Sequence, residues 1–434
     1  NERRWTSLAP MPGSGTRTDT TTARITARCL DLTLLVSRQG RGPLTGIDKV
    51  EIAYLRRLID EPEPLFLLVR TALGYILLDN SGAVDVLQKI ERKMPWGPID
   101  LIGRIRRNGT VERRRAEADL RRGALARCRK GRLKAMVRSR LPRGTAYLNV
   151  GHRHLTDEVL GGWHTAVGGQ VSVMVHDTIP LDYPQFQRPG TPEAFRNKLR
   201  RVAEHADLVI YNSNVTRADA ERWFSGWGNQ PKGTVAHLGV EVPGPALTEL
   251  PPAIDRARTY FVSLGTIEPR KNHAFLLDIW ESLAKELADD AMPVLVIAGS
   301  RGWANETLLQ RLDRSPLKGR SILEISDLDD QAVAALIAGS AGLLFPSLAE
   351  GFGLPPIEAA ALGVPVVCNE LPVFREVLGN IPVYADSGNV YLWRQIMTEL
   401  AEKRQAGHAR NGANFPATGI PTWTGHFNLV LKVT

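Results

Sequence analysis

Residues 342–368, GLLFPSLAEGFGLPPIEAAALGVPVVC, contain the arrangement of elements that decides the fold. Gly342–Phe345 and Val364–Cys368 are short apolar runs of the kind that forms buried strands. Between them two prolines open a short helix and Gly363 follows its end, because proline suits the first turn of a helix and glycine the residue after the last. The stretch therefore predicts a strand, a helix and a second strand.

The same alternation of short apolar runs and helical spacing continues on the N-terminal side of this stretch. Strands are predicted at Tyr260–Leu264, Val294–Ala298 and Ile322–Ile325. Helices such as Ala274–Glu286 and Gln331–Ala338 fill the gaps between them. Alternating strands and helices predict a parallel sheet that is covered on both faces.

The N-terminal half has a similar organisation. Cys29–Ser37 has the length and apolar content of a strand, Gln39–Gly46 is a loop with glycine and proline, and Ile47–Leu58 has helical spacing. A further helix is predicted at Pro192–Glu204. Further strands are predicted at Leu65–Val69, Gly74–Leu78, Ala146–Val150, Val171–Val175 and Leu208–Tyr211. The sequence therefore predicts an α/β protein with two doubly wound, Rossmann-like domains.

Prolines mark the boundary between the two domains. The run 243–256 holds four prolines, so we place a linker there, with an N-terminal domain at 26–242 and a C-terminal domain at 257–415. Two such domains imply a ligand cleft between them, outside the carboxyl ends of the strands. Residues 1–25 are expected to be a disordered lead-in, and 416–434 a C-terminal segment that could cross back to the N-terminal domain.

Composition narrows the class of protein. Hydrophobic residues make up 43% of the chain and charged residues 23%, which is within the globular range. No apolar run approaches the roughly 18 residues that a membrane-spanning helix needs. Cys29, Cys128 and Cys368 are scattered, which disfavours a disulfide framework or a structural zinc site and favours a reducing compartment. The polar start, Asn1–Arg4, looks trimmed and is compatible with a removed leader.

Positive charge is concentrated in one segment. The formal net charge is +9, and Leu101–Arg143 alone holds sixteen lysines or arginines and three acids. We expect this segment to be a helical insertion that binds an anionic membrane surface or a phosphate-bearing acceptor. A solvated insertion that binds nothing is the alternative. Nucleic acid is disfavoured because no aromatic residue is interleaved with the basic ones.

The loop and helix at 350–358 combine glycines with two acids. Gly351 and Gly353 allow backbone N–H groups to approach an anion at the start of the helix. Glu350 lies before the helix and Glu358 about one turn inside it, so both can face one cleft with a gap between them, as a nucleotide sugar would require. A helix cap with two acids that interact with the helix dipole is the plain structural alternative.

At this point the chain resembles a known family. Glu350 and Glu358, set in Gly-Phe-Gly-Leu-Pro, resemble the paired-glutamate motif of the retaining GT-B glycosyltransferases of family 4. Ser263–Asn272 is similar to the strand and donor-phosphate loop of that family, and Phe345-Pro-Ser-Leu precedes Glu350 in the same manner. The resemblance covers Tyr260–Val383 well and the N-terminal half more loosely. It implies the GT-B fold, two Rossmann-like domains that face a central cleft.

The resemblance also implies roles for residues of the C-terminal domain. Arg270 and Lys271 would neutralise the donor diphosphate, which is the main electrostatic task in transfer from a nucleoside diphosphate. Glu358 would hold the nucleotide ribose and Glu350 would lie by the donor sugar as a catalytic residue. The nucleotide base would sit against backbone near Ile325–Leu328. The predicted donor-binding residues are Arg270, Lys271, Gly351, Phe352, Gly353, Leu354 and Glu358, together with Gly46 of the N-terminal domain.

In the N-terminal domain, two segments resemble the family. Leu44–Asp48 is similar to the glycine loop that closes over the donor phosphate, with Gly46 at the point of close approach. His176 and Asp177 end a predicted strand, where cleft residues lie in an open parallel sheet. By resemblance, His176 would contact the donor sugar and Asp177 would lie near the acceptor, both as catalytic residues. A structural histidine is the alternative for His176.

Other polar residues give weaker signals. Asn212-Ser213 and His237–Val240 occupy strand ends, where a structural role is about as plausible as a functional one. His152 and His154 lack a third ligand nearby, so a metal site is improbable. Asp329-Asp330 starts a helix and is expected to cap it rather than bind a metal. We therefore expect no metal ion and no cofactor.

These resemblances predict transfer of a hexose from a nucleotide sugar to a hydroxyl, with retention at the anomeric carbon. Mannose from GDP-mannose is the expected donor, because Gly265–Asn272 and Ala298–Trp303 resemble bacterial polysaccharide mannosyltransferases. A UDP-sugar donor, or a catalytically silent partner subunit that binds glycan or lipid, is the alternative. The expected acceptor is a glycan or a lipid-linked acceptor in cell-surface polysaccharide assembly. The expected location is cytoplasmic, peripheral on the inner membrane face, with no nucleic-acid partner.

Overall fold

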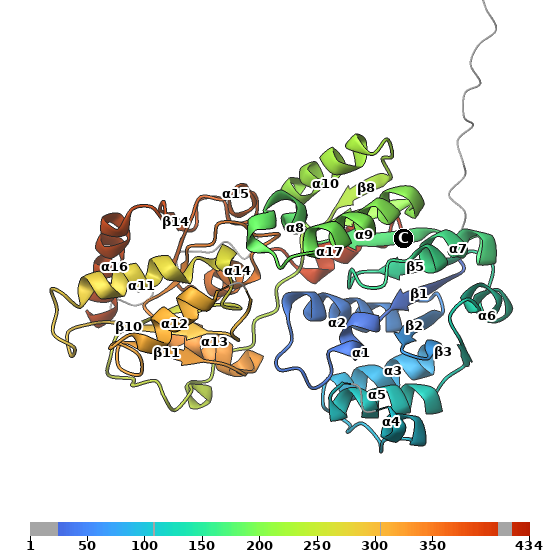
Figure 1. Cartoon of the computed structure of the whole chain (residues 1–434), viewed down its shortest axis with the longest axis horizontal. Helices are drawn as coiled ribbons and strands as arrows, with labels where there is room; N and C mark the ends of the chain where they lie inside the picture. Colours follow the sequence, from blue (N-terminus) through green and yellow to red (C-terminus); the bar gives the residue numbers. More distant parts are fainter. Residues whose placement is uncertain (1–24, 107–108, 304, 407–418) are drawn as a thin grey trace, which may run out of the picture.

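The structure, a computed structural model, describes residues 25–106, 109–303, 305–406 and 419–434. Two α/β domains lie side by side along the long axis of the molecule (Figure 1). One contains an eight-stranded sheet and the other a six-stranded sheet. Residues 1–24 of the predicted lead-in lie outside the described residues.

The sheet of the N-terminal domain has the strand order β4-β3-β2-β1-β5-β6-β7-β8. Its strands are β1 (Ala27–Asp31), β2 (Leu65–Thr71), β3 (Gly74–Leu78), β4 (Ala126–Cys128), β5 (Thr145–Asn149), β6 (Val171–Val175), β7 (Leu208–Tyr211) and β8 (Lys232–Val235). Its helices are α1 (Thr33–Ser37), α2 (Gly46–Ile59), α3 (Asn80–Ile90), α4 (Leu101–Ile105), α5 (Val111–Arg122), α6 (Leu133–Arg140), α7 (Asp157–Val167), α8 (Ile179–Asp182), η1 (Pro184–Phe186), α9 (Thr191–His205) and α10 (Asn214–Gly226).

The sheet of the C-terminal domain is parallel throughout, with the order β11-β10-β9-β12-β13-β14. Its strands are β9 (Tyr260–Leu264), β10 (Val294–Ala298), β11 (Ile322–Ile325), β12 (Gly342–Phe345), β13 (Val366–Cys368) and β14 (Val383–Tyr384). The helices of this half of the chain are η2 (Leu247–Glu249), η3 (Pro269–Lys271), α11 (His273–Leu283), α12 (Glu306–Arg314), α13 (Asp330–Gly339), α14 (Leu354–Ala361), α15 (Pro372–Leu378), α16 (Val390–Gln405) and α17 (Trp423–Val430).

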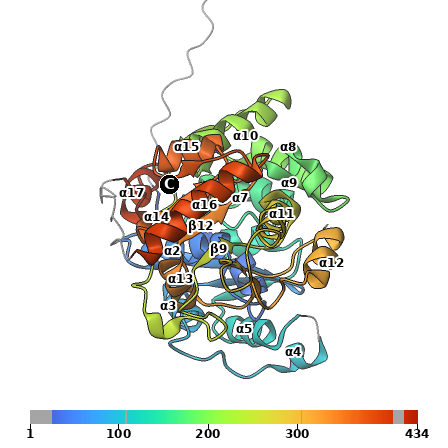
Figure 2. The ribbon, with the colours of Figure 1, turned by 90° about the vertical axis from the view of Figure 1, so that its left-hand side faces the viewer.

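Apolar side chains cover both faces of the C-terminal sheet. On one face, Phe261 and Leu344 of the sheet pack with residues of α11, α12 and α16, among them Trp280 and Trp393. On the other face, Val262 packs in a second cluster with residues of α13, α14 and α15. Figure 2, which looks from the side of this domain, shows α11, α12 and α16. Among the described residues, no helix has both the length and the apolarity that crossing a membrane requires.

The prediction of one strand over Cys29–Ser37 is wrong. The strand ends at Asp31, and Thr33–Ser37 forms α1. The Asp31 carboxylate accepts a hydrogen bond from the backbone N–H of Thr33 at 2.9 Å, and such a local bond turns the chain out of the extended conformation. A short apolar run does not distinguish a strand from a buried helix, so the sequence pattern could not reveal this change.

The expectation of a fully parallel sheet is also wrong at one edge. β2 pairs with β3 and β3 with β4 in antiparallel register. The turn Ala72-Leu73 between β2 and β3 is far too short for the crossover that parallel strands need. β4 lies inside the basic segment 101–143, so that segment is not a purely helical insertion but includes an edge strand of the sheet.

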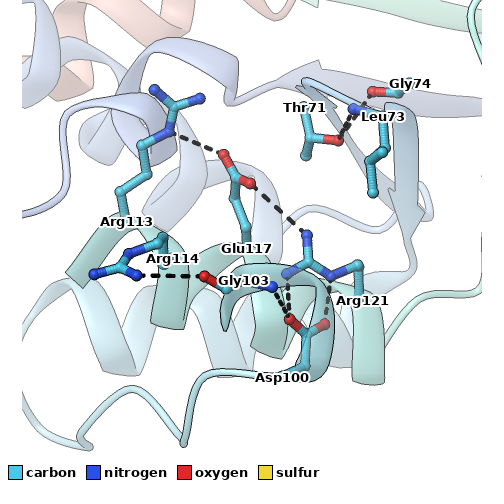
Figure 3. Close-up of polar contacts among 9 residues, drawn as sticks. All are labelled: Thr71, Leu73, Gly74, Asp100, Gly103, Arg113, Arg114, Glu117 and Arg121. Carbon is cyan, nitrogen blue, oxygen red and sulfur yellow. Dashed lines mark hydrogen bonds and ion pairs between the residues drawn. The ribbon is translucent and has the colours of Figure 1, made fainter. Parts of the chain in front are cut away.

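Several arginines of the basic segment are used inside the domain. The Arg121 guanidinium donates two hydrogen bonds to the Asp100 carboxylate at 2.6 and 2.8 Å, and Glu117 lies between Arg113 and Arg121 (Figure 3). Arg114 donates to the carbonyl of Gly103. Buried and bidentate ion pairs of this kind fix the packing of α4 on α5 rather than bind a partner.

The chain returns to the N-terminal domain at its C-terminal end. α17, drawn in red in Figure 1, packs on α2, where the Tyr54 hydroxyl lies 2.9 Å from Nε2 of His426. Nδ1 of His426 lies 3.2 and 3.1 Å from the carbonyl oxygens of Ala236 and His237. Burial lowers the pKa of His426 to about 4, so the ring is neutral and one histidine connects three separate segments.

Replacing His426 with alanine should lower the free energy of unfolding by about 2 kcal/mol, because the Tyr54 hydroxyl and two carbonyls would be left unpaired in a buried site. Urea unfolding of the purified variant measures this change. Leu429→Ala is the matched control on the same helix, since Leu429 is 49% exposed and its truncation should cost no more than about 1 kcal/mol. Equal losses from both variants would contradict the structural role of His426.

Candidate active site

The loops after β9 and β12 form one unit at the carboxyl edge of the C-terminal sheet. The backbone N–H of Leu348 donates to the carbonyl of Arg270 at 2.8 Å, and the Arg270 guanidinium donates to the carbonyl of Ala349 at 2.9 Å. Arg270 and Lys271 lie in η3, and Glu350 follows directly in the β12 loop. The structure therefore brings these three predicted site residues together.

Glu350 binds both predicted cations. Its Oε1 lies 2.6 Å from Nζ of Lys271, and its Oε2 lies 2.8 Å from a terminal nitrogen of Arg270. The side chains of Glu350 and Lys271 are only 7% and 10% exposed. Arg270 makes a second ion pair, with Glu268 at 2.7 Å. Two acids and two cations thus balance one another in a nearly closed cluster.

The charge cluster fixes the ionisation of Glu350. Burial alone would raise the pKa of this carboxyl, but the adjacent Arg270 and Lys271 cations outweigh burial and hold the pKa at about 2. Burial would likewise lower the pKa of Arg270, yet Glu350 and Glu268 raise it above its ordinary value. Glu350 is therefore a carboxylate at neutral pH and has no proton to donate.

The start of α14 offers unpaired backbone donors. Gly353 is its N-cap residue at φ +88°, with no capping side chain and no acid in the first turn. Pro355 and Pro356 have no N–H group. In the part of the chain that the structure describes, no acceptor is found for the backbone N–H groups of Gly351, Phe352, Gly353 and Leu354. Consecutive free amides at a helix N-terminus form a site for an anion.

The N-terminal domain approaches this site closely at two glycines. A Cβ atom on Gly351 would lie 2.6 Å from the carbonyl oxygen of His176 and 2.9 Å from Cβ of Asp177, so only glycine allows this contact. A Cβ atom on Gly46 would lie 3.0 Å from the side chain of Leu354. The predicted residues of both domains therefore converge around the start of α14.

His176 and Asp177 are both held in place by backbone contacts. Nε2 of His176 lies 2.7 Å from the carbonyl oxygen of Val150, so Nε2 carries the proton and Nδ1 is an acceptor. Burial lowers the pKa of His176, which keeps the ring neutral. Asp177 accepts from the N–H of Ile179 at 3.1 Å, and burial raises its pKa although Arg270 opposes this. His176 thus makes a structural hydrogen bond to Val150, and it also lies where the two domains meet.

Glu358 lies in a different part of the cleft from Glu350. It is buried in α14, and its Oε1 accepts from Nζ of Lys49 at 3.1 Å. Lys49 also lies 3.0 Å from the Asp330 carboxylate at the start of α13. Sequence reasoning missed Lys49 and treated Asp330 only as part of a helix cap. The available signal was a lysine in the first turn of a helix, where the dipole disfavours a cation.

A second contact between the domains was also missed. The Glu376 carboxylate of α15 accepts from the backbone N–H groups of Asn214 and Val215 at 2.7 and 3.1 Å, at the start of α10. It also lies 2.8 Å from Nε2 of His237. Asn212 donates to the carbonyl of His176 at 2.8 Å. His237 therefore contacts the other domain, whereas Asn212 fixes the backbone of His176 within the N-terminal domain.

The chain is similar to several known proteins. Residues 251–390 match the family described as glycosyl transferases group 1. The serotype-specific mannosyltransferase WbdA of Escherichia coli is 34% identical over 225 residues, which cover 49% of this chain and 27% of WbdA. The chain thus spans about a quarter of the length of that relative. The O-antigen chain mannosyltransferase B of Escherichia coli is 27% identical over 253 residues, 53% of this chain and 65% of that protein.

The fold has a counterpart among solved structures. HepE of Anabaena, in complex with UDP and glucose, matches with a TM-score of 0.62 at 16% identity, over 94% of this chain and 99% of HepE. The predicted GT-B architecture, with two Rossmann-like domains facing one cleft, is confirmed.

The ion pairs of Glu350 predict a dependence of stability on pH. Glu350→Gln should lower the free energy of unfolding at neutral pH by about 3 kcal/mol, because the buried Lys271 and the partly buried Arg270 lose their shared partner. A lowered folded-state pKa stabilises the protein above the ordinary value of 4.5, and this contribution is lost as the pH falls towards about 2. The difference between wild type and variant should therefore shrink on acidification.

Urea unfolding at several pH values measures that difference. Glu286→Gln is the control, because Glu286 pairs with Arg394 at the surface with 58% of its side chain exposed, and its loss should leave the stability nearly unchanged. A Glu350→Gln deficit that stays constant from neutral to acidic pH would show that the charge of Glu350 does not matter.

Proposed function

On the premise that residues 251–390 belong to the glycosyl transferases group 1 family, we propose that the protein moves a hexose from a nucleotide sugar to an acceptor hydroxyl with retention at the anomeric carbon. The observation that supports this proposal best is the arrangement around Gly351. Two cations, Arg270 and Lys271, and a row of free amides face the strand end of His176 and Asp177. The diphosphate of a nucleotide sugar needs such hydrogen-bond donors on one side, and the acceptor hydroxyl must reach the sugar from the other side.

The proposed mechanism assigns the C-terminal domain to the leaving group. Arg270, Lys271 and the amides of Gly351–Leu354 would stabilise the negative charge that develops on the departing diphosphate. Glu350 forms ion pairs with both cations, so the diphosphate would share them with this carboxylate. Because Glu350 has a pKa of about 2, it acts on the donor sugar through charge and not as a proton donor.

Transfer of the acceptor proton would need no acidic side chain of the protein. In a front-face reaction the leaving phosphate takes the proton of the acceptor hydroxyl, so the carboxylate spacing rule of glycosidases does not apply to Glu350 and Glu358. The protein orients donor and acceptor, and the close approach of Gly351 to His176 and Asp177 excludes water from the reacting atoms. Excluding water prevents hydrolysis of the donor.

For the donor we propose GDP-mannose. The relatives WbdA and the O-antigen chain mannosyltransferase B are named mannosyltransferases, and their matches include about half of this chain. HepE, which shares the fold, has been solved with UDP and glucose, so a uridine nucleotide is the competing donor. In either case the ribose would hydrogen-bond Glu358 and replace Lys49 there.

Replacing Lys271 with alanine should weaken the binding of GDP by about 1.5–3 kcal/mol, the contribution of a hydrogen bond to a charged group. Titration calorimetry with GDP and UDP measures this effect and identifies the nucleotide. Lys285→Ala is the control, since Lys285 is an exposed lysine of the same domain. Unchanged affinity for both nucleotides in Lys271→Ala would remove the proposed diphosphate site.

The two glutamates should have separate effects. Glu358→Ala should mainly weaken nucleotide binding. Glu350→Ala should mainly slow turnover with bound nucleotide retained, because the diphosphate would then serve as the anionic partner of Arg270 and Lys271. Calorimetry and steady-state kinetics of both variants distinguish these losses. Equal loss of nucleotide affinity in both variants would show that the roles are not divided in this way.

We further propose that the basic segment contacts an anionic membrane surface, where a lipid-linked acceptor would be found. Many of its exposed cations form no ion pair among the described residues, and they include Arg127, Arg129, Lys130, Arg132, Lys134, Arg138 and Arg140. In the same segment α4 exposes Leu101 and Ile105, by 71% and 73%, one helical turn apart. Each cation near an anionic surface contributes up to about 1 kcal/mol.

Sedimentation with vesicles tests this membrane contact. The protein should sediment with anionic vesicles at low salt and be released as salt rises, because screening shortens the range of the attraction. Replacing Arg127, Arg129 and Arg132 with glutamine should abolish sedimentation and leave nucleotide binding intact. The control replaces Lys285, Arg314 and Lys403, which are exposed cations of the other domain. Equal sedimentation with neutral and anionic vesicles would contradict the proposal.

A further inference from the structure

The loop after β5 has an unusual backbone. His152 and His154 both adopt left-handed conformations, at φ +54° and +55°, although neither is glycine. Such conformations cost of order 1 kcal/mol or more and persist where the surrounding structure requires them. Here Nδ1 of His154 lies 2.9 Å from the Arg70 guanidinium, and the carbonyl of Arg153 accepts from Asn149 at 3.0 Å. The loop is thus held in one shape beside the end of β6.

Lys198 of α9 reaches this loop, where its hydrogen-bond partner is neutral. Its Nζ donates to the carbonyl of His152 at 3.2 Å and lies 4.6 Å from the centre of the Phe195 ring. Among the residues that the structure describes, Lys198 forms no ion pair, whereas Lys271 across the cleft is bound by Glu350. A largely buried ammonium group with one carbonyl partner has donors left for an anion.

More unneutralised positive charge surrounds the loop. Arg153 is exposed and lies within electrostatic range of both Lys198 and His154, and neither Arg153 nor Arg70 pairs with a carboxylate in the described parts of the chain. Burial, followed by the charges of Arg70 and Arg153, lowers the pKa of His154 to about 4. Nε2 of His152 is buried and has no hydrogen-bond partner. These groups together form a cationic edge with spare donors.

We propose that Lys198, Arg153 and His152 form a phosphate-binding acceptor subsite next to His176 and Asp177. Asp177 lies within electrostatic range of Lys198, and the His152 and His176 rings are 6.4 Å apart, so a phosphate here would be adjacent to the reacting edge. A phosphate suits several converging donors better than a neutral sugar does. The inference deepens the proposed function, since it adds a charged group to the acceptor whose hydroxyl reacts.

Methyl phosphate is the probe, because it has the proposed group without a sugar or a nucleotide. Titration calorimetry should show that it binds the wild-type protein and that Lys198→Gln and Arg153→Gln each weaken binding about tenfold, as expected for a charge-assisted bond. Arg200→Gln is the matched control, since Arg200 is exposed on the same helix over the Trp227 ring. This control should keep wild-type affinity.

The pH dependence separates a charge effect from a folding defect. Burial lowers the pKa of Lys198 to about 8, Asp177 opposes this, and Arg153 adds to it, while burial keeps the facing His152 and His176 rings neutral. Affinity should therefore fall as the pH rises through about 8 and Lys198 loses its charge. Lys198→Arg should bind methyl phosphate and lose this pH dependence, because arginine stays charged.

Two further measurements identify the binding site and the source of the phosphate. Because methyl phosphate can also bind at Arg270 and Lys271, the titration is repeated in the Lys271→Ala background. Lys198→Gln should weaken binding there by the same factor as in the wild type, and this result stands even if nucleotide binding and the proposed function fail. If Lys198→Gln also weakens binding to phosphatidylcholine vesicles that contain phosphatidic acid, the phosphate is a lipid headgroup; if only methyl phosphate binding falls, it is borne by a soluble or glycan acceptor. Absent binding, unchanged affinity in Lys198→Gln and Arg153→Gln, or no effect of Lys198→Gln in the Lys271→Ala background overturns the inference.

Discussion

The buried contact of Glu350 with Arg270 and Lys271 is the interaction on which the rest of the site depends. Two cations this poorly exposed would be costly to keep charged without a carboxylate between them. With Glu350 present they stay charged at the carboxyl edge of the sheet, next to the free amides of α14. The cluster thus keeps both cations charged and largely shielded from water, in position to share their hydrogen bonds with an anion. Such preorganised charge is how proteins stabilise a leaving anion.

The relation between the domains follows from a few polar contacts at opposite places. Lys49 reaches Glu358 across the cleft, and Glu376 binds the start of α10. α17 returns to the N-terminal domain, where His426 meets Tyr54. These contacts bring Gly351 against the end of β6, so the anion site of one domain faces the polar strand ends of the other. A donor and an acceptor would therefore meet where the two domains touch.

Sequence patterns predicted the bounds of four C-terminal strands, β9, β10, β11 and β12. β9, β10 and β12 lie inside the sheet and are buried, and a parallel strand in that position is a short continuous apolar run. β11 lies at the edge of the sheet and is only partly buried. The same pattern failed at Thr33–Ser37, where a hydrogen bond from the backbone N–H of Thr33 to the Asp31 carboxylate marks the end of the strand. It predicted the bounds of β3 but not its antiparallel pairing, which depends on a short turn and not on apolar content.

The candidate site was predicted only in part. Resemblance to a family pointed to Glu350, Glu358, Arg270 and Lys271, but single-sequence patterns contain no information on which distant residues meet them. Lys49, Glu376 and Lys198 are ordinary charged residues of helices in the sequence. Their importance comes from contacts with residues far away in the sequence, as between Lys49 and Glu358. Only the folded arrangement reveals such contacts.

The most direct test of the central claim is a crystal structure of the protein with GDP bound. The diphosphate should lie at the start of α14, hydrogen-bonded to backbone amides of Gly351–Leu354 and in contact with Arg270 and Lys271. Glu358 should contact the ribose in place of Lys49. A nucleotide bound elsewhere, with no phosphate contact to Arg270 or Lys271, would contradict the claim that this charge cluster is the donor site.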